Sequence, residues 1–558
     1  MVKNGRPKSL ASFEEIINKS VLSVFIRVQI LLSFVLMKPD PKPHNLRELL
    51  EAQVRKFPNK TFLYFFNDGR KISYAALNRQ VNQVANLFLR LGISKGQTLS
   101  LLLPNIPEYV LCYFACMTIG AVASPLNIHL KSKETEYILA HSESRLLVTN
   151  QKYWPVVEPV RAAVSSLQYI LLLDGALSNT LSFPEELTKE STELAPISLQ
   201  REDVAIMIYT SGTTGDPKGC LLTHGNFLFN VQEIARWLNF SERDRLLCIM
   251  PLFHVNGIVV TMLTPLYIGG SMVLMEKFST HKFWEIIDRY RVTSFGSVPT
   301  MLTILNQTPY PEGCLERLDK SHLRFALSGS APVPPEVMLQ FEKKFHCLVV
   351  EGYGLSEATC RVTFNPPNQR RRPGSIGLPI GNILRIVDEN EVHVPLGQIG
   401  EILVQGRNVM KGYFKNPEAT AKALHEGWLH TGDLGYVDGD GFYYVVDRKS
   451  DMIIRGGENI YPREIDNLLF EHPKIREAAT VGVPDELYGE EVKAFVVLKE
   501  GEIASEDEIL AFCRERLADY KCPKSIVFLE EIPKGPTGKL LKRELMKGGR
   551  KTTINDSN

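Results

Sequence analysis

The segment from Tyr209 to Gly219 constrains this chain more than any other. It reads Tyr-Thr-Ser-Gly-Thr-Thr-Gly-Asp-Pro-Lys-Gly and follows the apolar run Val204–Ile208. We expect a buried strand that leads into a phosphate-binding loop, because glycines let the backbone approach an anion closely, while hydroxyls and a lysine add donors and charge. The loop is not of the Walker A type, which needs Ser or Thr directly after the lysine, whereas Gly219 follows Lys218 here. A flexible Ser/Thr/Gly linker is the alternative, but such linkers rarely follow a strand of this kind.

Length and composition point to a globular protein with more than one domain. A chain of 558 residues exceeds one ordinary hydrophobic core. Hydrophobic residues make up 44% and charged residues 23%, which is typical of a soluble protein. The net charge of +1 gives no electrostatic reason to expect nucleic acid as a partner. The nine cysteines are dispersed without zinc-like spacing, which favours a reduced, cytoplasmic compartment.

The first 44 residues form an extension with an apolar segment. Apolar residues between positions 21 and 36 follow helical spacing, so we expect an added helix over residues 13–37. Its longest charge-free run, Val28–Met37, is too short to cross a bilayer, which needs about 20 apolar residues. A signal peptide is the alternative, but no Ala-x-Ala-like cleavage site is present. The helix is expected to contact either a membrane surface or the body of the protein.

From Asn45 onward the pattern predicts a large multi-layer α/β domain with mostly parallel sheets, because helices and buried strands alternate. The expected helices are 46–57, 73–91 and 108–120, and the expected strands are 98–103, 121–125, 145–148, 169–173, 245–250 and 271–275. Short strands at 384–388, 400–405 and 441–447 predict a β-rich section that closes this domain.

A small α+β domain is expected after the polar residues 447–451. Its predicted strands are 453–454, 478–483 and 492–498, and its predicted helices are 462–471 and 506–517. The domains are therefore 1–44 (the extension), 45–447 (large domain), 448–450 (hinge), 451–547 (small mobile domain) and 548–558 (a disordered tail).

Four further segments carry candidate functional residues, and each has an ordinary structural explanation as well. The segment 251–257 contains His254, which alone fits a structural histidine. The segment 351–359 contains Tyr353, suited to stacking on a base, and Glu357, a hard oxygen ligand suited to Mg²⁺, but it also fits a turn capped by Ser356. The segment 428–433 ends in Asp433, which suits two ribose hydroxyls. The segment 533–543 presents Lys539 in a basic loop that is otherwise typical of a solvated surface.

The order of these motifs resembles the adenylate-forming acyl-CoA synthetase superfamily, which includes luciferases and the adenylation domains of peptide synthetases. The resemblance covers about residues 45–547. The segments Glu276–Trp284, Arg455–Asn459 and Val492–Val497 are similar to crotonobetaine/carnitine-CoA ligases and to medium- or long-chain fatty acid ligases.

The resemblance implies a ligase that uses ATP, Mg²⁺ and coenzyme A. A carboxylic acid attacks the α-phosphate of ATP to give an acyl-adenylate and pyrophosphate, and a thiol then displaces AMP. The implied phosphate ligands are Thr210, Ser211, Gly212, Thr213, Thr214, Gly215 and Lys218, with Mg²⁺ on Glu357. Adenine would be framed by Gly329, Ser330, Ala331, Pro332, Glu351, Gly352 and Tyr353, and ribose would be bound by Asp433 and Arg448.

The remaining implied roles concern catalysis and the second half-reaction. Lys539 would bridge the acid and the α-phosphate, and His254 would lie beside the acyl carboxylate. The small domain would rotate between the two steps, and Gly457 would leave room for the pantetheine arm. Ser450 stands where the family commonly has Asp or Lys at the pivot, and Ser356 replaces the usual Thr but keeps its hydroxyl.

Several alternatives remain open from the sequence. An aryl-CoA ligase or a luciferase-like enzyme would share the ATP motifs, a phosphotransferase would release ADP, and a scaffold would bind nucleotide without catalysis. The acyl group is expected to be fatty or carnitine-like, but the residues that line its pocket cannot be assigned from the sequence. Homodimers are frequent among related ligases, so a homodimer is allowed.

Overall fold

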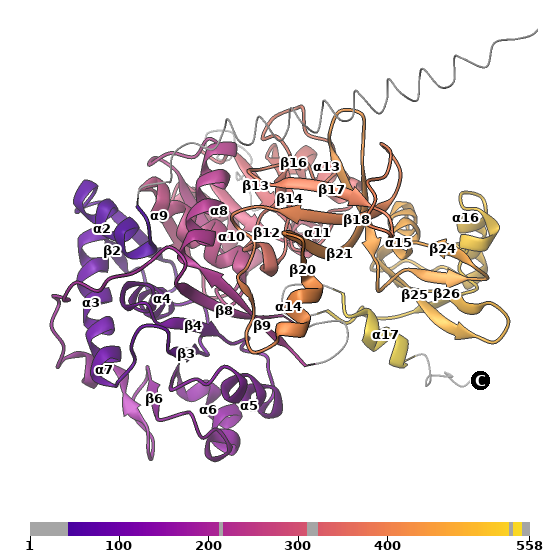
Figure 1. Ribbon diagram of the computed structural model, residues 1–558. Coiled ribbons are helices and arrows are strands. Elements are labelled where there is room, and N and C mark those ends of the chain that lie inside the picture. The colour runs from indigo at the N-terminus through magenta and orange to yellow at the C-terminus, as the bar shows by residue number, and fades with distance from the viewer. Residues whose placement is uncertain (1–42, 211–215, 310–321, 535–539, 549–558) are drawn as a thin grey trace, which may run out of the picture.

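The computed structural model describes residues 43–210, 216–309, 322–534 and 540–548 (Figure 1). It is a mixed α/β structure with two large sheets in the N-terminal part, a smaller sheet after them and a separate α+β unit at the C-terminal end. The predicted fold class is thereby confirmed. The expected helix over residues 13–37 and the tail from residue 549 lie outside the described residues.

Most strands of the two large sheets run parallel to their neighbours, as the alternating pattern predicted. In order across the first sheet the strands are β19 (Gly412–Tyr413), β9 (Lys218–Thr223), β8 (Val204–Thr210), β4 (Val122–Pro125), β3 (Thr98–Leu101), β5 (Leu146–Thr149), β6 (Tyr169–Leu172) and β7 (Leu181–Ser182). Across the second they are β16 (Leu378–Pro379), β15 (Thr363–Phe364), β14 (Leu348–Tyr353), β13 (Phe325–Ser328), β12 (Ser294–Ser297), β10 (Arg245–Cys248), β11 (Ser271–Leu274), β1 (Thr61–Phe65) and β2 (Lys71–Ser73).

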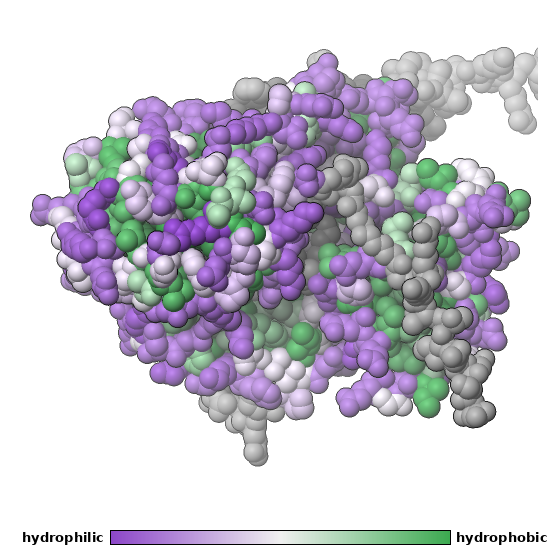
Figure 2. All heavy atoms as spheres, turned by 90° about the horizontal axis from the view of Figure 1, so that it is seen from below, coloured by the Kyte–Doolittle hydropathy of each residue, from purple (hydrophilic) through white to green (hydrophobic). Residues whose placement is uncertain are grey.

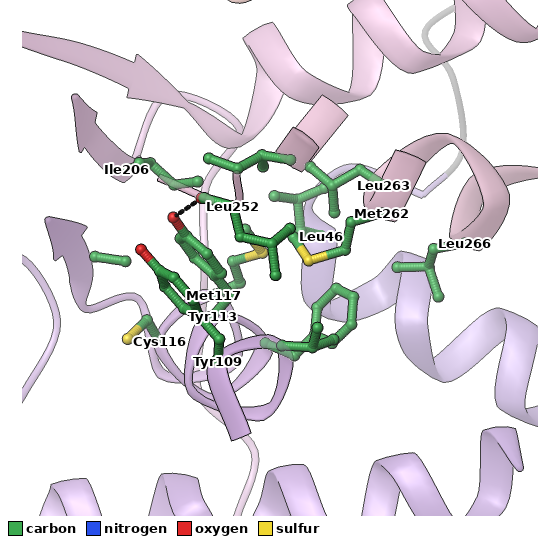
Figure 3. Packing of buried hydrophobic residues seen from close by; sticks show 14 of the residues in the cluster. Leu46, Tyr109, Tyr113, Cys116, Met117, Ile206, Leu252, Met262, Leu263 and Leu266 are labelled. Atoms are coloured by element: carbon green, nitrogen blue, oxygen red, sulfur yellow. Dashed lines mark hydrogen bonds between the residues drawn. The ribbon is translucent and has the colours of Figure 1, made fainter. Parts of the chain in front are cut away.

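The main hydrophobic core lies between the two large sheets. Helix α4 (Pro107–Ile119) is buried on all sides, and only Glu108 among its residues is not. Figure 3 shows its stacked Tyr109 and Tyr113, and the Tyr113 hydroxyl donates to the carbonyl of Leu252 at 2.6 Å. The other helices that contribute to this core are α2 (Leu46–Lys56), α3 (Tyr74–Arg90), α8 (His224–Trp237), the π-helix η3 (Asn256–Leu263) and α9 (Thr264–Ile268).

A second core covers the other face of the second sheet, because side chains alternate along a strand. On β10, Leu246 and Cys248 join the main core, whereas Leu247 joins the second one. The helices on this face are α10 (Thr280–Arg289), α11 (Pro299–Gln307) and α13 (Pro335–Phe345). A smaller cluster covers the outer face of the first sheet with α5 (Ser132–His141), η1 (Gln151–Tyr153), α6 (Trp154–Val157) and η2 (Glu158–Ala163), and α7 (Phe183–Leu187) follows β7.

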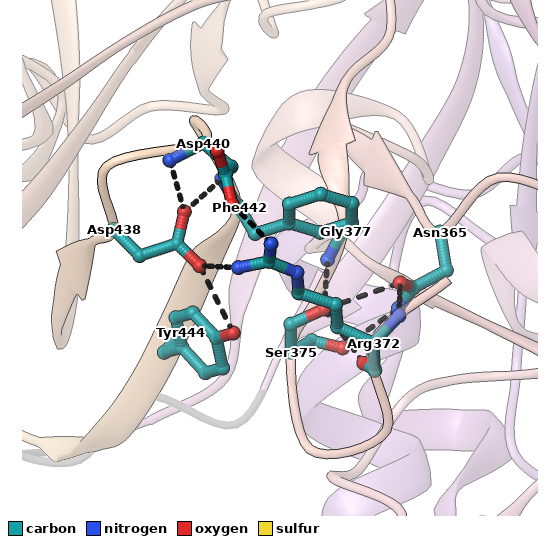
Figure 4. A network of polar contacts seen from close by, with 8 residues as sticks. All are labelled: Asn365, Arg372, Ser375, Gly377, Asp438, Asp440, Phe442 and Tyr444. Carbon is teal, nitrogen blue, oxygen red and sulfur yellow. Dashed lines mark hydrogen bonds and ion pairs between the residues drawn. The ribbon is translucent and has the colours of Figure 1, made fainter. Parts of the chain in front are cut away.

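The β-rich section is a third sheet that carries the connection to the C-terminal unit. Its elements are β17 (Ile383–Val387), β18 (Gly400–Gln405), α14 (Pro417–Ala423), β20 (Leu424–His425), β21 (Trp428–Val437) and β22 (Tyr443–Arg448). Figure 4 shows how the loop before it is fixed: the Arg372 guanidinium pairs with Asp438 and Asp440, and the Tyr444 hydroxyl also donates to Asp438.

The C-terminal unit, which we call the lid, has its own core of apolar residues that include Ile453, Ile465 and Leu469. Its elements are β23 (Ile453–Arg455), β24 (Glu458–Ile460), α15 (Pro462–Glu471), β25 (Ile475–Asp485), β26 (Gly489–Leu498), α16 (Glu506–Arg514), η5 (Asp519–Lys521), β27 (Ser525–Phe528) and α17 (Lys542–Gly548). Two predictions are corrected. Helix 506–517 ends at Arg514, because Arg516 and Leu517 turn back to the carbonyl of Cys513. The strands predicted at 478–483 and 492–498 extend into a longer antiparallel hairpin.

The surface seen from below is mostly hydrophilic, and its hydrophobic areas are small and scattered (Figure 2). Across the described parts of the chain, we find no helix whose length and hydropathy would suit a membrane span.

Candidate functional site

The predicted phosphate loop connects two antiparallel strands. Thr210 at the end of β8 pairs in register with Lys218 at the start of β9. The two ends of the loop are therefore held side by side at the edge of the first sheet. Ser211, Gly212, Thr213, Thr214 and Gly215, the middle of the motif, lie outside the described residues.

Glu357 lies beside this loop and joins three distant segments of the chain. It is carried by the short helix η4 (Ser356–Ala358), which follows β14. Its Oε1 accepts a hydrogen bond from the Tyr413 hydroxyl at 2.9 Å and a longer one from the Thr210 hydroxyl at 3.4 Å. The Lys218 ammonium lies 5.3 Å from the centre of the Tyr413 ring. A carboxylate, a hydroxyl and an ammonium thus converge at the predicted triphosphate site.

A pocket of about 280 Å³ adjoins Lys218 on the outer side of the loop. His141 lines it, and its Nδ1 lies 2.7 Å from the Tyr209 hydroxyl. The Tyr137 hydroxyl donates to the carbonyl of Pro217 at 3.2 Å. Helix α5 therefore supports both ends of the predicted phosphate loop.

A second cluster forms where β14, β21 and β22 meet. The Tyr353 hydroxyl donates to Oδ2 of Asp433 at 2.5 Å, and Nε of Arg448 lies 3.2 Å from Oδ1. Asp433 is only 6% exposed and pairs in register with Arg448. A buried carboxylate fixed on both sides is suited to receive the hydroxyls of a ribose, and this role of Asp433 stays a prediction.

The residues predicted to frame adenine lie at two adjacent strand ends. Gly329–Pro332 follow β13, and Glu351–Tyr353 end β14. The Glu351 side chain is 2% exposed and accepts a hydrogen bond from the Val333 N–H at 3.0 Å. Burial raises the pKa of its carboxyl to about 7. Glu351 therefore supports the Gly329–Pro332 loop from inside the protein.

His254 follows β10 and precedes η3. Its Nε2 is buried and has no hydrogen-bond partner among the described residues. Burial lowers the pKa of His254 to about 4, so the imidazole is neutral at physiological pH. A neutral ring is compatible with the predicted position beside an acyl carboxylate.

The predicted hinge is anchored on the β-rich section. The Lys449 N–H donates to the carbonyl of Gly432 at 2.8 Å, and its ammonium lies 3.4 Å from Glu401. Ser450 is exposed, and its hydroxyl donates to the Asp451 carboxylate at 3.0 Å. On the lid, the Arg463 N–H donates to Asp447 at 2.9 Å, which fixes α15 against β22.

The lid carries two predicted residues. Gly457 lies in the exposed turn between β23 and β24 with φ +90°, and nothing lies within 4 Å of the position that a β carbon would occupy. Lys539 lies outside the described residues, and the two residues that flank it on the described chain, Lys534 and Leu540, form a β-bridge.

Comparison with known families identifies this arrangement. The family described as AMP-binding enzyme matches residues 50–414, and its C-terminal domain matches residues 464–539. The chain belongs to the AMP-binding enzyme family. It is therefore an enzyme of the adenylate-forming acid-CoA ligase type that uses ATP and coenzyme A. The predicted resemblance is confirmed.

Three curated relatives of this AMP-binding enzyme act on different acids, as their names state. The chain is 38% identical to a sulfoacetate–CoA ligase of Cupriavidus necator, over 90% of this chain and 97% of that protein. It is 36% identical to a long-chain-fatty-acid–CoA ligase of Bacillus subtilis, over 91% and 96%. It is 35% identical to a crotonobetaine/carnitine–CoA ligase of Salmonella paratyphi B, over 90% and 98%.

Solved structures of AMP-binding enzymes share the fold. The anthranilate CoA ligase AuaEII in complex with anthranoyl-AMP matches with a TM-score of 0.84 at 30% identity, over 91% of this chain and 98% of that one. MatB from Rhodopseudomonas palustris matches at 31% identity, over 90% and 98%, with a TM-score of 0.83 for the ATP-bound form and 0.74 for the apo form.

Two residues of this AMP-binding enzyme were missed by the sequence analysis. Tyr413 binds Glu357 from a position 56 residues away in the chain, and no spacing signal links the two. Arg463, the second residue of the predicted helix Pro462–Glu471, connects the lid to β22, and no pattern in the sequence assigns it a role.

The residues around Glu357 fit a magnesium ion. Its carboxylate is a hard oxygen ligand next to a hydroxyl, and its Oε2 has no partner among the described residues. A separate surface group, Glu391, His425 and His430, has ligand atoms within 4.8 Å of one another. Its imidazoles suit a transition metal better than magnesium, so Glu357 is the better candidate for the ion that accompanies ATP.

Proposed function

We propose that this enzyme activates a carboxylic acid as an acyl-adenylate, with release of pyrophosphate, and then transfers the acyl group to coenzyme A. The observation that carries the proposal is the convergence of Thr210, Lys218 and Glu357 at one edge of the first sheet. These groups supply the hydroxyl, ammonium and carboxylate that a triphosphate with magnesium requires.

The nucleotide is oriented by contacts that do not react. Asp433 binds the ribose hydroxyls while Tyr353 and Arg448 hold its carboxylate in place. Glu357 is the residue that would hold magnesium, which offsets the charge of the phosphates when bound. Lys218 and the phosphate loop bind the β- and γ-phosphates, and Lys539 stabilises the charge that develops on the α-phosphate. Preorganised groups of this kind each contribute about 10²–10³ in rate.

The lid rotates about Lys449 and Ser450 between the two half-reactions. In the described arrangement, Gly457 and the neighbouring Ile454, Leu487 and Tyr488 are exposed, by 50%, 78% and 41% for the three apolar side chains. This apolar face packs against the large domain when the lid turns for thiol attack.

The acid is of the fatty or carnitine-like classes suggested by the sequence, or of another class used by the relatives. Three such classes are sulfoacetate, long-chain fatty acids and crotonobetaine or carnitine. The reaction type does not depend on which acid is used, because the residues proposed to bind ATP contact the nucleotide and not the acyl group.

The test is the release of pyrophosphate from ATP in the presence of a panel of acids, with AMP and ADP separated by chromatography. We expect pyrophosphate and AMP in equal amounts, only when an acid is present, and acyl-CoA when coenzyme A is added. Formation of ADP would identify a phosphotransferase and contradict the proposal. Binding of ATP with no turnover on any acid would identify a nucleotide-binding scaffold and contradict it as well.

A further inference from the structure

Arg361 is a buried arginine behind the loops expected to frame adenine. It lies four residues after Glu357, and its side chain is only 2% exposed. Arginine is rarely buried unless it has a charged partner, because removal of its charge from water is costly. The contacts of this side chain therefore indicate what kind of chemical group binds next to it.

The backbone of Arg361 is fixed by two asparagines. Asn230 on α8 accepts from its N–H at 3.1 Å and donates to its carbonyl at 2.6 Å. Asn408 donates to the same carbonyl at 3.1 Å. The direction of the side chain is thus set by packing and is not left to a mobile loop.

Only some of the hydrogen-bond donors of the guanidinium have acceptors. Its Nη1 donates to the carbonyl of Gly352 at 3.0 Å, and it lies 5.2 Å from the centre of the Phe364 ring. Its Nε and Nη2 are buried and have no hydrogen-bond partner among the described residues. Burial lowers the pKa of Arg361 from its usual value, and the nearby Glu351 charge offsets this only in part.

No described carboxylate forms an ion pair with Arg361. The nearest candidate in the sheet, Glu351, pairs in register with Ser328 and binds the N–H of Val333. Its charge acts on Arg361 and raises the pKa of the guanidinium, but burial outweighs this effect and no hydrogen bond joins the two side chains among the described residues. The Nε and Nη2 donors of Arg361 are therefore open to an anion that is not part of the described chain.

Glycine lets the loop after β13 pass close to Arg361. A β carbon on Gly329 would lie 2.1 Å from Nη1 of Arg361, so this loop lies directly over the guanidinium. Asn256 donates to the Ser330 hydroxyl, next to Gly329, at 3.3 Å, and its Oδ1 is another buried atom without a partner among the described residues. Ligands of α/β sheets bind beyond the carboxyl ends of the strands, where this loop begins.

We propose that Arg361 binds a second anionic group on the acid, at the end opposite the carboxylate that is activated. The substrate class is then a short acid with a second carboxylate or a sulfonate, and this inference rests on the proposed function. A guanidinium offers paired donors that match either oxyanion. The acid is short because Arg361 touches Gly329 and Gly352, which belong to the segments expected to contact the nucleotide.

The same geometry disfavours the two classes expected from the sequence. A long alkyl chain would leave the guanidinium without a counter-ion and would meet the polar Asn256, whose buried Oδ1 also lacks a partner among the described residues. A quaternary ammonium group would be repelled by the Arg361 charge. Such a site discriminates strongly between acids with and without the second anionic group, because an acid that lacks it leaves the buried guanidinium unpaired.

The experiment compares acids that differ only in the second charge. Pyrophosphate release by the full chain is measured with oxalate, malonate, succinate and sulfoacetate, with the monomethyl esters of the three dicarboxylates, with trimethylglycine and with octanoate. We expect the preferred dianionic acid to exceed its ester by roughly 10²-fold in kcat/KM. Comparison between the carboxylates and sulfoacetate shows which oxyanion is preferred.

Variants of Arg361 identify the residue responsible. Arg361→Gln removes the charge, Arg361→Lys retains it, and Arg243→Gln changes an exposed arginine as the matched control. Arg361→Gln should raise KM for the dianionic acid roughly 10²-fold and leave activity on its ester within a few-fold, with partial recovery in Arg361→Lys. Arg243→Gln should match the wild type.

Three outcomes would overturn the inference. They are equal activity of the wild type on a dianionic acid and its ester, preference for octanoate or trimethylglycine, and an equal loss on every acid in Arg361→Gln. The wild-type comparison stands even if that variant does not fold. Absence of pyrophosphate release with every acid would instead refute the proposed function on which the inference rests.

Discussion

Glu357 shows how single contacts define this site at the scale of residues. Its carboxylate accepts hydrogen bonds from the hydroxyls of Thr210 and Tyr413, which lie far apart in the sequence. The ring of Tyr413 also lies under the Lys218 ammonium. A few side chains therefore set the charge at the predicted phosphate site and the orientation of that charge, and substitutions can distinguish these two roles.

Substitutions of Glu357 and Tyr413 distinguish the effect of the carboxylate charge from the effect of its orientation. Glu357→Gln removes the negative charge and should lower the rate of pyrophosphate release about 10²–10³-fold. Tyr413→Phe keeps the ring under Lys218 and removes only the hydroxyl, so we expect a loss of roughly tenfold. Rates are measured at saturating ATP and magnesium. A larger loss in Tyr413→Phe than in Glu357→Gln would contradict these roles.

Glu351 predicts a pH dependence of stability. Burial raises the pKa of its carboxyl to about 7 in the folded protein, above the value of 4.5 for an unperturbed carboxyl. The folded state therefore holds a proton that the unfolded chain has released. The stability from this group is full below the unfolded pKa and is lost as the pH rises through about 7, a change on the order of 3 kcal/mol.

The measurement is Tm between pH 5 and pH 8. Glu351→Gln lacks the titrating group, so its Tm should fall less than that of the wild type as the pH rises. Glu502→Gln, at an exposed glutamate, is the matched control and should follow the wild type. Parallel curves for Glu351→Gln and the wild type would show that the buried carboxyl does not titrate as described.

At the scale of elements, local patterns predicted most helices and strands, and long-range contacts escaped prediction. The helix Pro462–Glu471 has the predicted bounds, because proline near its start and apolar spacing are local signals. The lid hairpin runs further than predicted, since residues 484–490 at its tip are exposed or half-buried and so lack the buried apolar pattern of a strand. Tyr413 and Arg361 could not be assigned, because their roles depend on residues brought near only by folding.

The hinge is the element whose change should affect one half-reaction alone. Ser450 is exposed, and no backbone hydrogen bond from its N–H is found among the described residues. Ser450→Pro restricts the backbone torsions there and so should preserve pyrophosphate release while blocking thioester formation. Ser450→Ala, which removes only the hydroxyl, should retain both steps. Both rates are measured on the same acid, and their equal loss in Ser450→Pro would contradict rotation about this position.

At the scale of the whole molecule, the enzyme has a large N-terminal part and the smaller C-terminal unit that we call the lid (Figure 1). The exposed apolar face around Gly457 is what the proposed rotation of the lid would cover. Membrane contact through residues 13–37 and assembly into a homodimer stay predictions, as do the boundaries of the domains.

The central claim is that the lid brings Lys539 to the triphosphate bound on the large domain. The direct measurement is the effect of Lys539→Ala on each half-reaction separately, namely acid-dependent pyrophosphate release and the attack of coenzyme A on a supplied acyl-adenylate. The acyl-adenylate is prepared from an acid that the wild type activates.

We predict that Lys539→Ala slows pyrophosphate release by about 10²–10³-fold, because a preorganised charge is lost where negative charge develops. Thiol attack on the supplied adenylate should stay within a few-fold of the wild type. Unchanged pyrophosphate release, or an equal loss of both half-reactions, would contradict the claim.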